Sequence, residues 1–595
     1  MNQIKQKLQD ILKNTIKTTY DINLDEINLE TPPKKELWDF AFGCFVLSKE
    51  LHKNPAIIAL ELKDILLSPN FLKSGLKDIS TAGPYLNIKL DYSFYADIFK
   101  DYTLENQNIW QNQNIVIDYI WANVWKPLHI GHMCTPNIWQ VIINLYKKLW
   151  YNVISDSHIG DWGIIFWKLI LAYKKWWDEE KLFENAVEYL LELYIKITSE
   201  SEKDNSLEEQ FRQEFKKLSS WNKESVEFWA KFTSESIKAV NISLSRMWIK
   251  PDFDIWESFY EGIWLPKLQN YPDLKYSMKD IVKELVEKWI ATKNEDGSIW
   301  VIFPDEKIPS CMLQKRDGTH GYLASDLAAI KYRIDNWNPK KILYFVDVRQ
   351  KLHLTQAFEI AKLAWWINIV KSEDDNNKCD LIHAYNWFIS LKTGAMSSRK
   401  WNIIKLDKLL DESNSRAKKI ILEKRNDISW EELEELAEII WIWAIKYWYL
   451  SKSRTSDVVF DWDDAMTFEW NSWPYLQYAY VRALRIIEKS EFSEDDIDNF
   501  LINSKFWSSF EVDLFNEIVN YNDILLEVSE NLLPHQLCAY LYSLTKSFSS
   551  FYNNVQILWE KDEEYKKFKL KLVLEFVKIV RDIFEILAIK LPTKM

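Results

Sequence analysis

Two histidines three residues apart, His129 and His132, could do chemistry in the stretch His-Ile-Gly-His. An apolar, strand-like run at residues 115–120 precedes them, and a helix is expected to begin near Gly131. A turn of small residues at a helix start offers backbone N–H groups and the positive end of the helix dipole to a phosphate. The imidazoles would then stabilise charge that develops on a phosphoryl group. A shared zinc ion is the alternative, but no further histidine stands nearby in the sequence.

A second candidate element is the basic and hydroxyl-rich stretch Met396-Ser-Ser-Arg-Lys400, which follows a strand candidate far downstream. Taken alone, such a stretch is usually a solvated turn.

The elements that must position these residues form a strand, a turn, a helix and a second strand between residues 115 and 159. This order predicts a parallel nucleotide-binding sheet. Further strand signals occur at 298–306, 340–348 and 379–385, and a charged helical region at 168–290 is expected to be inserted into the sheet. The predicted fold is α/β: a Rossmann-like parallel-sheet catalytic domain with an inserted helical region, a small α+β N-terminal module and an all-α C-terminal domain. The predicted boundaries are 1–105, 106–405 and 406–595.

Seven ordered segments resemble one family. They are VWKPLHIGHM (124–133), DSHIGDWG (156–163), DGTHGYLASDLAAIKYR (317–333), VRQKLHLTQAFEIAK (348–362), GAMSSRKWN (394–402), FDWDDAMTFEWNSWPYLQYAYVRA (460–483) and PTKM (592–595). The first and fifth resemble the HIGH and KMSKS signatures of class I aminoacyl-tRNA synthetases, and the whole set looks like arginyl-tRNA synthetase. The resemblance covers the whole chain, including an N-terminal tRNA-contact module and a helical anticodon-binding domain.

The resemblance implies an ATP-dependent arginine–tRNA ligase. Arginine and ATP, with Mg²⁺ on the phosphate oxygens, would form arginyl-adenylate and pyrophosphate, and a ribose hydroxyl at the 3′ end of tRNA(Arg) would then accept the arginine. The catalytic residues expected by motif are His129, His132, Lys126, Arg399 and Lys400. The ATP contacts expected by motif are His129, Gly131, His132, Met396, Ser397 and Ser398.

One departure from the family concerns lysine. Ala395 occupies the position where many class I enzymes have the first lysine of their second signature. Some arginyl-tRNA synthetases share this lack and carry a lysine just before the first signature, which here is Lys126.

Arginine binding calls for carboxylates, because the guanidinium is a planar fork that a carboxylate holds with two hydrogen bonds. Asp118 and Asp326 match the family's acidic contacts, and Asn123, Tyr322 and Gln350 match its polar contacts to the amino acid. Asp118 ends a strand, which is where ligands bind in such sheets. The alternative for Asp326 is an ordinary acid at a helix N-terminus.

Composition excludes several classes of protein. Net charge is −13 with a pI near 5.4, so bulk charge gives no hint of nucleic acid. The five cysteines form no C-x-x-C pair, which argues against disulfides and against a structural metal, and favours a reducing, cytoplasmic setting. We expect no membrane span and a monomer.

Glycine and tryptophan depart from ordinary usage. A chain of this length averages about 42 glycines, and the 11 glycines and 31 tryptophans together match that number. The family has glycine or another small residue at many tryptophan positions of this chain, and has tryptophan at positions 162 and 462. The small-residue positions are Trp121, Trp125, Trp139, Trp150, Trp167, Trp401, Trp470 and Trp473. We interpret most tryptophans as glycines encoded by UGA and written as tryptophan by standard translation.

Two other functions and one partner question stay open at this point. The chain could be another class I synthetase or nucleotidyl transferase, or a tryptophan-rich binding protein that displays exposed indoles. In the C-terminal domain, Tyr475, Tyr478, Tyr480 and residues 549–554 could stack on anticodon-loop bases or could be helix core.

Overall fold

The structure is a computed structural model. It describes residues 2–30, 32, 38–68, 75–101, 113–119, 125–161, 164–219, 222–262, 271–367, 379–387, 389–391, 404–424, 427–465, 473–500 and 507–591.

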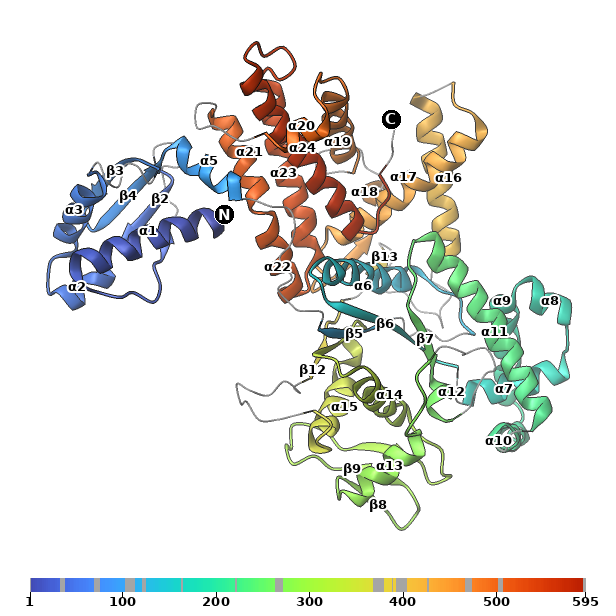
Figure 1. Ribbon diagram of the computed structural model, residues 1–595. Coiled ribbons are helices and arrows are strands. Elements are labelled where there is room, and N and C mark those ends of the chain that lie inside the picture. The colour runs from blue at the N-terminus through green and yellow to red at the C-terminus, as the bar shows by residue number, and fades with distance from the viewer. Residues whose placement is uncertain are drawn as a thin grey trace.

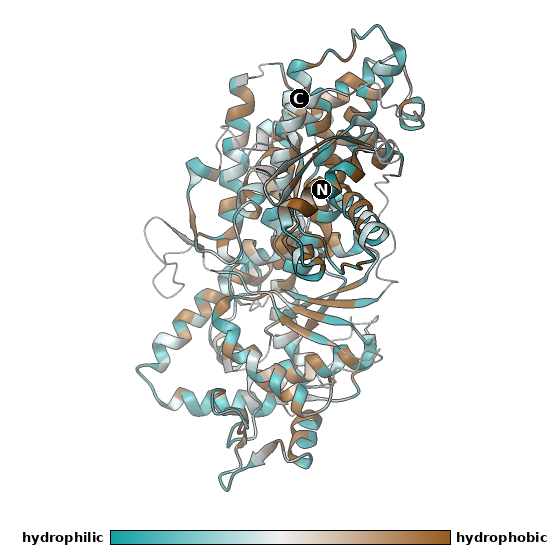
Figure 2. Ribbon diagram, turned by 90° about the vertical axis from the view of Figure 1, so that its left-hand side faces the viewer, coloured by the Kyte–Doolittle hydropathy of each residue, from teal (hydrophilic) through white to brown (hydrophobic). Residues whose placement is uncertain are grey.

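A five-stranded parallel sheet forms the centre of the molecule. Its strands, in spatial order, are β12 (Asp380–His383), β11 (Lys341–Tyr344), β5 (Asn114–Tyr119), β6 (Asn152–Ile159) and β7 (Phe253–Trp256). Ile115, Val116 and Ile117 of β5 are fully buried, because helices cover both faces of the sheet. β-branched residues suit such a strand, which needs no polar face. Figure 2 shows these strands largely in brown, the colour of hydrophobic residues.

The chain order along this sheet reverses between β5 and β11. α6 (Ile130–Lys148) covers one face, while α14 (Tyr322–Trp337) and α15 (Lys351–Leu363) cover the other (Figure 1). Ligands of open parallel sheets bind beyond the carboxyl ends of the strands at such a reversal. The predicted Rossmann-like domain is confirmed. The strand order of its sheet reverses beside β5, so a ligand is expected at the carboxyl end of that strand.

The helical insertion lies between β6 and β7. It comprises α7 (Ile164–Lys175), α8 (Glu179–Glu184), α9 (Ala186–Ser201), α10 (Ser206–Ser219) and α11 (Lys223–Arg246). The region 168–290 is not helical throughout, because it contains β7, and α12 (Glu257–Tyr260) and α13 (Met278–Glu287) follow that strand. A strand of four residues is too short to give a period that sequence analysis could find.

A second, antiparallel sheet stands apart from the parallel one. Its order is β10 (Cys311–Gln314), β9 (Ile299–Val301) and β8 (Ala291–Lys293). β9 confirms the strand expected within 298–306, but it lies outside the nucleotide-binding sheet.

The N-terminal module is a four-stranded antiparallel sheet with helices. Its elements are α1 (Asn2–Tyr20), β1 (Leu29–Glu30), β2 (Phe40–Gly43), α2 (Phe45–Leu51), α3 (Pro55–Leu66), β3 (Leu76–Ala82), β4 (Tyr85–Leu90) and α5 (Tyr92–Asp101). Figure 1 shows this module as a separate blue lobe that meets the C-terminal helices through α5. The Phe99 ring of α5 packs edge-on against Phe515, with 5.1 Å between centroids.

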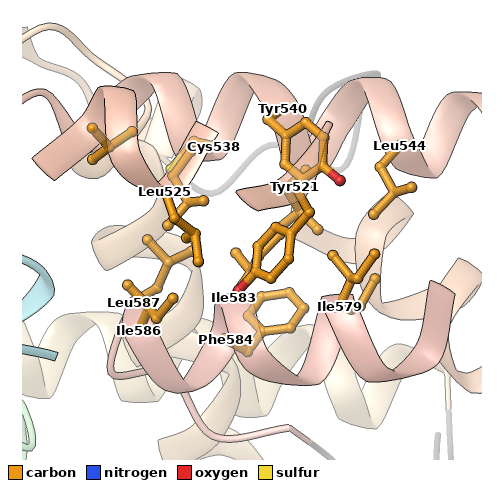
Figure 3. Packing of buried hydrophobic residues seen from close by; sticks show 14 of the residues in the cluster. Tyr521, Leu525, Cys538, Tyr540, Leu544, Ile579, Ile583, Phe584, Ile586 and Leu587 are labelled. Carbon is orange, nitrogen blue, oxygen red and sulfur yellow. The ribbon is translucent and has the colours of Figure 1, made fainter. Parts of the chain in front are cut away.

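The C-terminal part is helical apart from a short parallel pair of strands. The pair is β13 (Ile389–Leu391) with β14 (Val458–Phe460). The helices of this part are α16 (Leu406–Lys424), α17 (Trp430–Leu450), α18 (Trp462–Ala465), α19 (Trp473–Glu488), α20 (Glu494–Asp498), α21 (Ser509–Val519), α22 (Tyr521–Asn531), α23 (Pro534–Asn554) and α24 (Glu563–Ile586). The short helix η1 (Val348–Gln350) precedes α15 beside the parallel sheet. Figure 3 shows the core where α22, α23 and α24 pack.

The far end of α6 is bonded to this helical part. The Asn144 side chain donates to the carbonyl of Glu585 at 3.0 Å, and Lys148 pairs with Asp582 at 2.8 Å. One element therefore runs from the C-terminal turn of α24 to the sheet edge. Among the described helices, none is both long and apolar enough to cross a membrane.

Candidate active site

The two histidines of the first motif hold the start of α6 together. His129 is the N-cap, and its Nδ1 accepts the backbone N–H of Gly131 at 3.1 Å. Nδ1 of His132 accepts the backbone N–H of His129, also at 3.1 Å. A Cβ on Gly131 would lie 2.8 Å from Cε1 of His129, so a larger residue here would displace this ring.

These bonds determine the protonation of both rings. In each ring Nδ1 is an acceptor, so the proton of the neutral imidazole must be on Nε2. Burial lowers the pKa of His129 to about 4, with help from the positive charges of Lys126 and Arg349. Burial, with His129 and Lys126, lowers the pKa of His132 to about 3. At neutral pH both side chains are therefore uncharged N–H donors at a helix N-terminus.

The segment that follows the second motif lies directly beside the first. The backbone N–H of Ile130 donates to the carbonyl of Ile404 at 3.1 Å, and that of Leu406 donates to the carbonyl of Leu128 at 2.8 Å. Residues 128–130 and 404–406 thus run antiparallel through a bridge between His129 and Lys405. No third histidine, cysteine, aspartate or glutamate joins the histidine pair to hold a metal ion within the described ranges.

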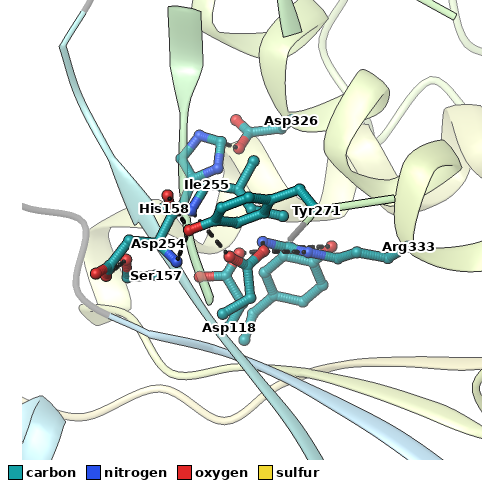
Figure 4. Close-up of polar contacts among 10 residues, drawn as sticks. Asp118, Ser157, His158, Asp254, Ile255, Tyr271, Asp326 and Arg333 are labelled. Atoms are coloured by element: carbon teal, nitrogen blue, oxygen red, sulfur yellow. Dashed lines mark hydrogen bonds and ion pairs between the residues drawn. The ribbon is translucent and has the colours of Figure 1, made fainter. Parts of the chain in front are cut away.

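Asp118 lies at the carboxyl end of β5, where strand register places it beside Asp156 on β6 and Tyr344 on β11. Arg333 of α14 contacts all three (Figure 4). Its guanidinium donates to Oδ2 of Asp118 and to Oδ2 of Asp156, both at 2.6 Å, and to the Tyr344 hydroxyl at 3.3 Å. Burial raises the pKa of Asp156 to about 7, and Arg333 acts against this rise.

This contact bears on the expected role of Asp118. Its carboxylate is 1% exposed and already holds a guanidinium of the protein itself. Breaking a buried ion pair of this kind costs about 3–5 kcal/mol. The contact of Asp118 with bound arginine stays a prediction, while its pairing with Arg333 is a feature of the structure.

Asp326 has different partners at the same edge. It lies on α14, and its side chain is 5% exposed. Nε2 of His353 on α15 lies 2.5 Å from Oδ2, and Nε2 of His158 on β6 lies 3.6 Å from Oδ1. Figure 4 shows His158 facing Asp326 above the Arg333 cluster. Among the described side chains, Asp326 therefore has imidazoles, and no guanidinium or ammonium, as its close partners.

The remaining predicted contacts lie on the same two helices. Tyr322 begins α14 one turn before Asp326 and is 64% exposed, so its hydroxyl is available to a ligand. Gln350 is exposed and precedes His353 by three residues at the start of α15, which places both on one helix face.

Some predicted site residues lie outside the described residues. They are Asn123, Met396, Ser397, Ser398, Arg399 and Lys400. The structure also adds four residues with no predicted role, namely Asp156, His158, Arg333 and His353. All four lie within the seven sequence segments that resemble arginyl-tRNA synthetase. That resemblance was the only feature of the sequence that could have pointed to them.

Three family models match the chain. They are the arginyl tRNA synthetase N terminal domain over residues 2–90, the class I (R) tRNA synthetase catalytic domain over 96–462, and the DALR anticodon binding domain over 476–595.

Relatives match over full length. The arginine–tRNA ligase of Clostridium botulinum strain Alaska E43 is 33% identical and covers 99% of this chain and 100% of its own. That of Fusobacterium nucleatum is 32% identical and covers 100% of both.

Solved structures agree in fold. The arginyl-tRNA synthetase of Plasmodium falciparum has a TM-score of 0.75 at 23% identity and covers 100% of this chain and 99% of its own. That of Thermus thermophilus has a TM-score of 0.71 at 20% identity, covering 99% and 100%. With a parallel sheet, paired histidines at a helix start and full-length relatives of one kind, the chain belongs to the arginyl-tRNA synthetase family of class I aminoacyl-tRNA synthetases.

Proposed function

We propose that this chain is an ATP-dependent arginine–tRNA ligase whose reaction takes place at the edge of the sheet between α6 and α14. Arginine and ATP form arginyl-adenylate and pyrophosphate, and a ribose hydroxyl at the 3′ end of tRNA(Arg) then accepts the arginine. One observation supports this most strongly. The uncharged imidazoles of His129 and His132 lie at the same sheet edge as the carboxylate of Asp326, whose imidazole partners a ligand can replace.

The start of α6 is the proposed phosphate site. Nε2–H groups of His129 and His132 and the helix dipole favour negative charge on the α-phosphate as its phosphorus becomes five-coordinate. Both rings keep this role near neutral pH, because their pKa values of about 4 and about 3 leave them uncharged there. ATP would carry Mg²⁺ on its β- and γ-phosphate oxygens. Lys126, Met396, Ser397, Ser398, Arg399 and Lys400 remain the predicted further contacts to ATP.

Asp326 is the proposed receptor of the substrate guanidinium. A guanidinium binds a carboxylate through two parallel hydrogen bonds, and imidazoles release a carboxylate more readily than Arg333 does. Tyr322, Gln350, Asn123 and Asp118 are the other proposed arginine contacts.

The test is ATP–pyrophosphate exchange dependent on arginine, with tRNA(Arg) present. Asp326→Asn should cost about 2–4 kcal/mol of arginine recognition, that is, a KM raised by about 30-fold or more. An unchanged KM and kcat in Asp326→Asn would remove Asp326 from the site.

The C-terminal helices are the proposed anticodon-binding part. Between α19 and the end of α23 lies a pocket of about 840 Å³. The Arg482 guanidinium lies 4.3 Å from the ring centroid of Tyr478 and 4.5 Å from that of Tyr552, and both rings are exposed. Such rings and a cation can stack on unpaired bases. Tyr480 is core, since it is 4% exposed.

The second part of the proposal is that most tryptophans are glycine in the native protein. Four tryptophans have left-handed φ between 55° and 65°, at the position just after a helix, where glycine is preferred. They are Trp150, Trp248, Trp289 and Trp365. Each makes the hydrogen-bond pair of a Schellman end; Trp289, for example, donates to Val286 and Ile290 donates to Leu285.

Buried indoles give independent support. A buried tryptophan usually finds a partner for its N–H. Trp125, Trp256 and Trp507 are at most 8% exposed, and their Nε1 atoms have no partner among the described residues. By contrast, Trp462 packs on Phe460 and under Arg416, as expected of a true tryptophan.

Peptide mass spectrometry of protein from the native organism tests the recoding directly. Glycine masses at positions 150, 248, 289 and 365 are expected, with tryptophan at 462. Tryptophan at the first four positions would refute the proposal. We also expect the native protein to be a cytoplasmic monomer. Light scattering on the purified chain would measure its mass and so test the monomeric state.

A further inference from the structure

Asp326 lies between two imidazoles that come from two other elements of the fold. His353 of α15 is close, at 2.5 Å, and its side chain is 24% exposed. His158 of β6 is farther away, at 3.6 Å, and its side chain is 5% exposed. His158 also lies over the ring of Tyr260, with 6.0 Å between centroids and 22° between planes. The pair of Asp326 and His353 is thus the part of this cluster nearest to solvent.

The other charges near this pair form a group of their own. Asp118 at the end of β5 and Asp156 on β6 share Arg333 of α14, and Tyr344 of β11 completes that group. These groups, with His158 and Tyr260, are titratable neighbours of Asp326 and His353. Arg333 cannot lose its charge in a protein. The side chains in direct contact with Asp326 are the two histidines, so a proton exchanged at its carboxylate is carried by one of them.

His353 is the histidine that holds this proton. Burial lowers the pKa of His353, but the hydrogen bond and the charge of Asp326 outweigh burial, and that pKa lies above its ordinary value of 6.5. For His158, burial dominates and its pKa lies below the ordinary value. In the free enzyme the imidazolium is therefore on His353, on the solvent side of Asp326.

We propose that His353 is the replaceable counter-ion of Asp326: it carries a proton while the site is empty and releases that proton to solvent when the guanidinium of arginine takes its place. This inference rests on the proposed role of Asp326 in binding arginine. His353 acts through Asp326 and is a positioning residue for specificity.

Two consequences follow for recognition. A guanidinium and an imidazolium on one carboxylate would repel each other, so arginine binding and loss of the proton are linked. A neutral analogue such as citrulline brings no charge to replace the proton, and it leaves the ion pair of Asp326 and His353 in place. The counter-ion thus makes the empty site selective against uncharged side chains of the same shape.

The sign of the pH dependence follows from this linkage. Below the pKa of His353, each unit of pH should tighten arginine binding by about tenfold, because one proton must leave for each arginine bound. Above that pKa, affinity should be constant. The window of change lies at and just above pH 6.5, since the pKa is raised.

The experiment is isothermal titration calorimetry of arginine into the full chain. At each pH, two buffers of different ionisation enthalpy give the number of protons released. The wild type should release close to one proton per arginine near pH 6 and none near pH 9. His353→Gln keeps an N–H donor for Asp326 but has no proton to lose, so it should release none and should bind arginine with a Kd independent of pH. It should also bind citrulline more tightly relative to arginine.

The matched control is His535→Gln on α23, far from this cluster, which should keep the wild-type proton release. Absence of proton release in the wild type overturns the proposal without any variant. If Asp326→Asn abolishes arginine binding while His353→Gln still releases the proton, the counter-ion assignment is wrong and the site assignment stands. If Asp326→Asn binds arginine normally, the proposed role of Asp326 and this inference both fail.

Discussion

Replacing Trp289 with glycine should stabilise this protein, although it removes the largest side chain there is. Trp289 has a φ of 60° after the last turn of α13. Left-handed backbone costs an L-residue about 1–2 kcal/mol, and glycine adopts it freely. Trp289 is 94% exposed, so the indole has almost no packing to lose. Glycine gains about 0.5–1 kcal/mol of chain entropy when unfolded, which leaves a net stabilisation of about 0.5–1 kcal/mol.

The same argument applies to Trp365 and Trp150, which are 69% and 53% exposed and have φ of 60° and 65°. Trp248 is left out, because its ring contacts Lys446 and Lys590 and its removal would change packing. Trp150 follows α6, whereas Lys288 before Trp289 donates to the carbonyl of Ala364 before Trp365, so we expect additivity for Trp150, and a double-mutant cycle measures the coupling of the other two. A simple sum of the three gains is about 1.5–3 kcal/mol for the triple glycine variant.

Differential scanning calorimetry of the full chain measures this effect. For a unit of 150–250 residues, 1 kcal/mol shifts Tm by about 2–4 °C, so the transition that contains the parallel sheet should rise by roughly 3–12 °C in the triple variant. The matched control is Trp559→Gly. Trp559 is 84% exposed and is not among the described residues with positive φ. Its replacement should leave Tm unchanged or lower it slightly. Equal shifts for Trp289→Gly and Trp559→Gly would refute the backbone argument.

Three further predictions concern charged and ionisable side chains. His129→Asn keeps a good N-cap but loses the Nε2 donor, so kcat for adenylate formation should fall by about 10²–10³-fold with little change in Tm. Because the pKa of His129 is about 4, the pH profile of wild-type kcat should show no ionisation of this residue between pH 6 and 8. Arg333→Met leaves Asp118 and Asp156 without a counter-ion and should cost about 3–5 kcal/mol in urea unfolding; a loss below about 1 kcal/mol would contradict the buried pairing. Lys446 is buried, and desolvation lowers its pKa from 10.5 to about 7. Between these two pH values the unfolded chain binds more protons than the folded chain, so stability should rise with pH from about 7 to 10. Lys446→Met should remove that rise, measured as Tm against pH.

Local periodicity was sufficient to predict the elements that hold the phosphate site. β5 is an uninterrupted apolar run because both of its faces are buried, and α6 begins at the residue where its capping histidines stand. Short elements were not predictable in this way. β7 has four residues, and β9 shows a strand pattern that does not reveal which sheet it joins. Sheet membership depends on contacts between segments far apart in sequence, which periodicity does not contain.

The acidic residues of the site show the same limit more sharply. Asp118 and Asp326 were both predicted from sequence as arginine contacts, and nothing local distinguishes them. Their partners do: Arg333 is 215 residues from Asp118, and His353 is 27 from Asp326. Only the register of β5 with β6 and β11 brings Asp118, Asp156 and Tyr344 under one guanidinium.

The two kinds of counter-ion suit two different tasks. A guanidinium keeps its charge at every pH, so Arg333 remains a cationic partner for Asp118 and Asp156 and holds three elements of the sheet edge together whatever the site contains. An imidazole loses its charge near neutral pH, so the carboxylate of Asp326 can pass from His353 to an incoming cation without a charge being left buried and unpaired. A site built to bind guanidinium next to a guanidinium of its own needs this difference. A permanent cation on α15, introduced by His353→Arg, would fill the recognition carboxylate at every pH. That variant should show no arginine binding by calorimetry, while its free form should unfold at a higher urea concentration than the wild type.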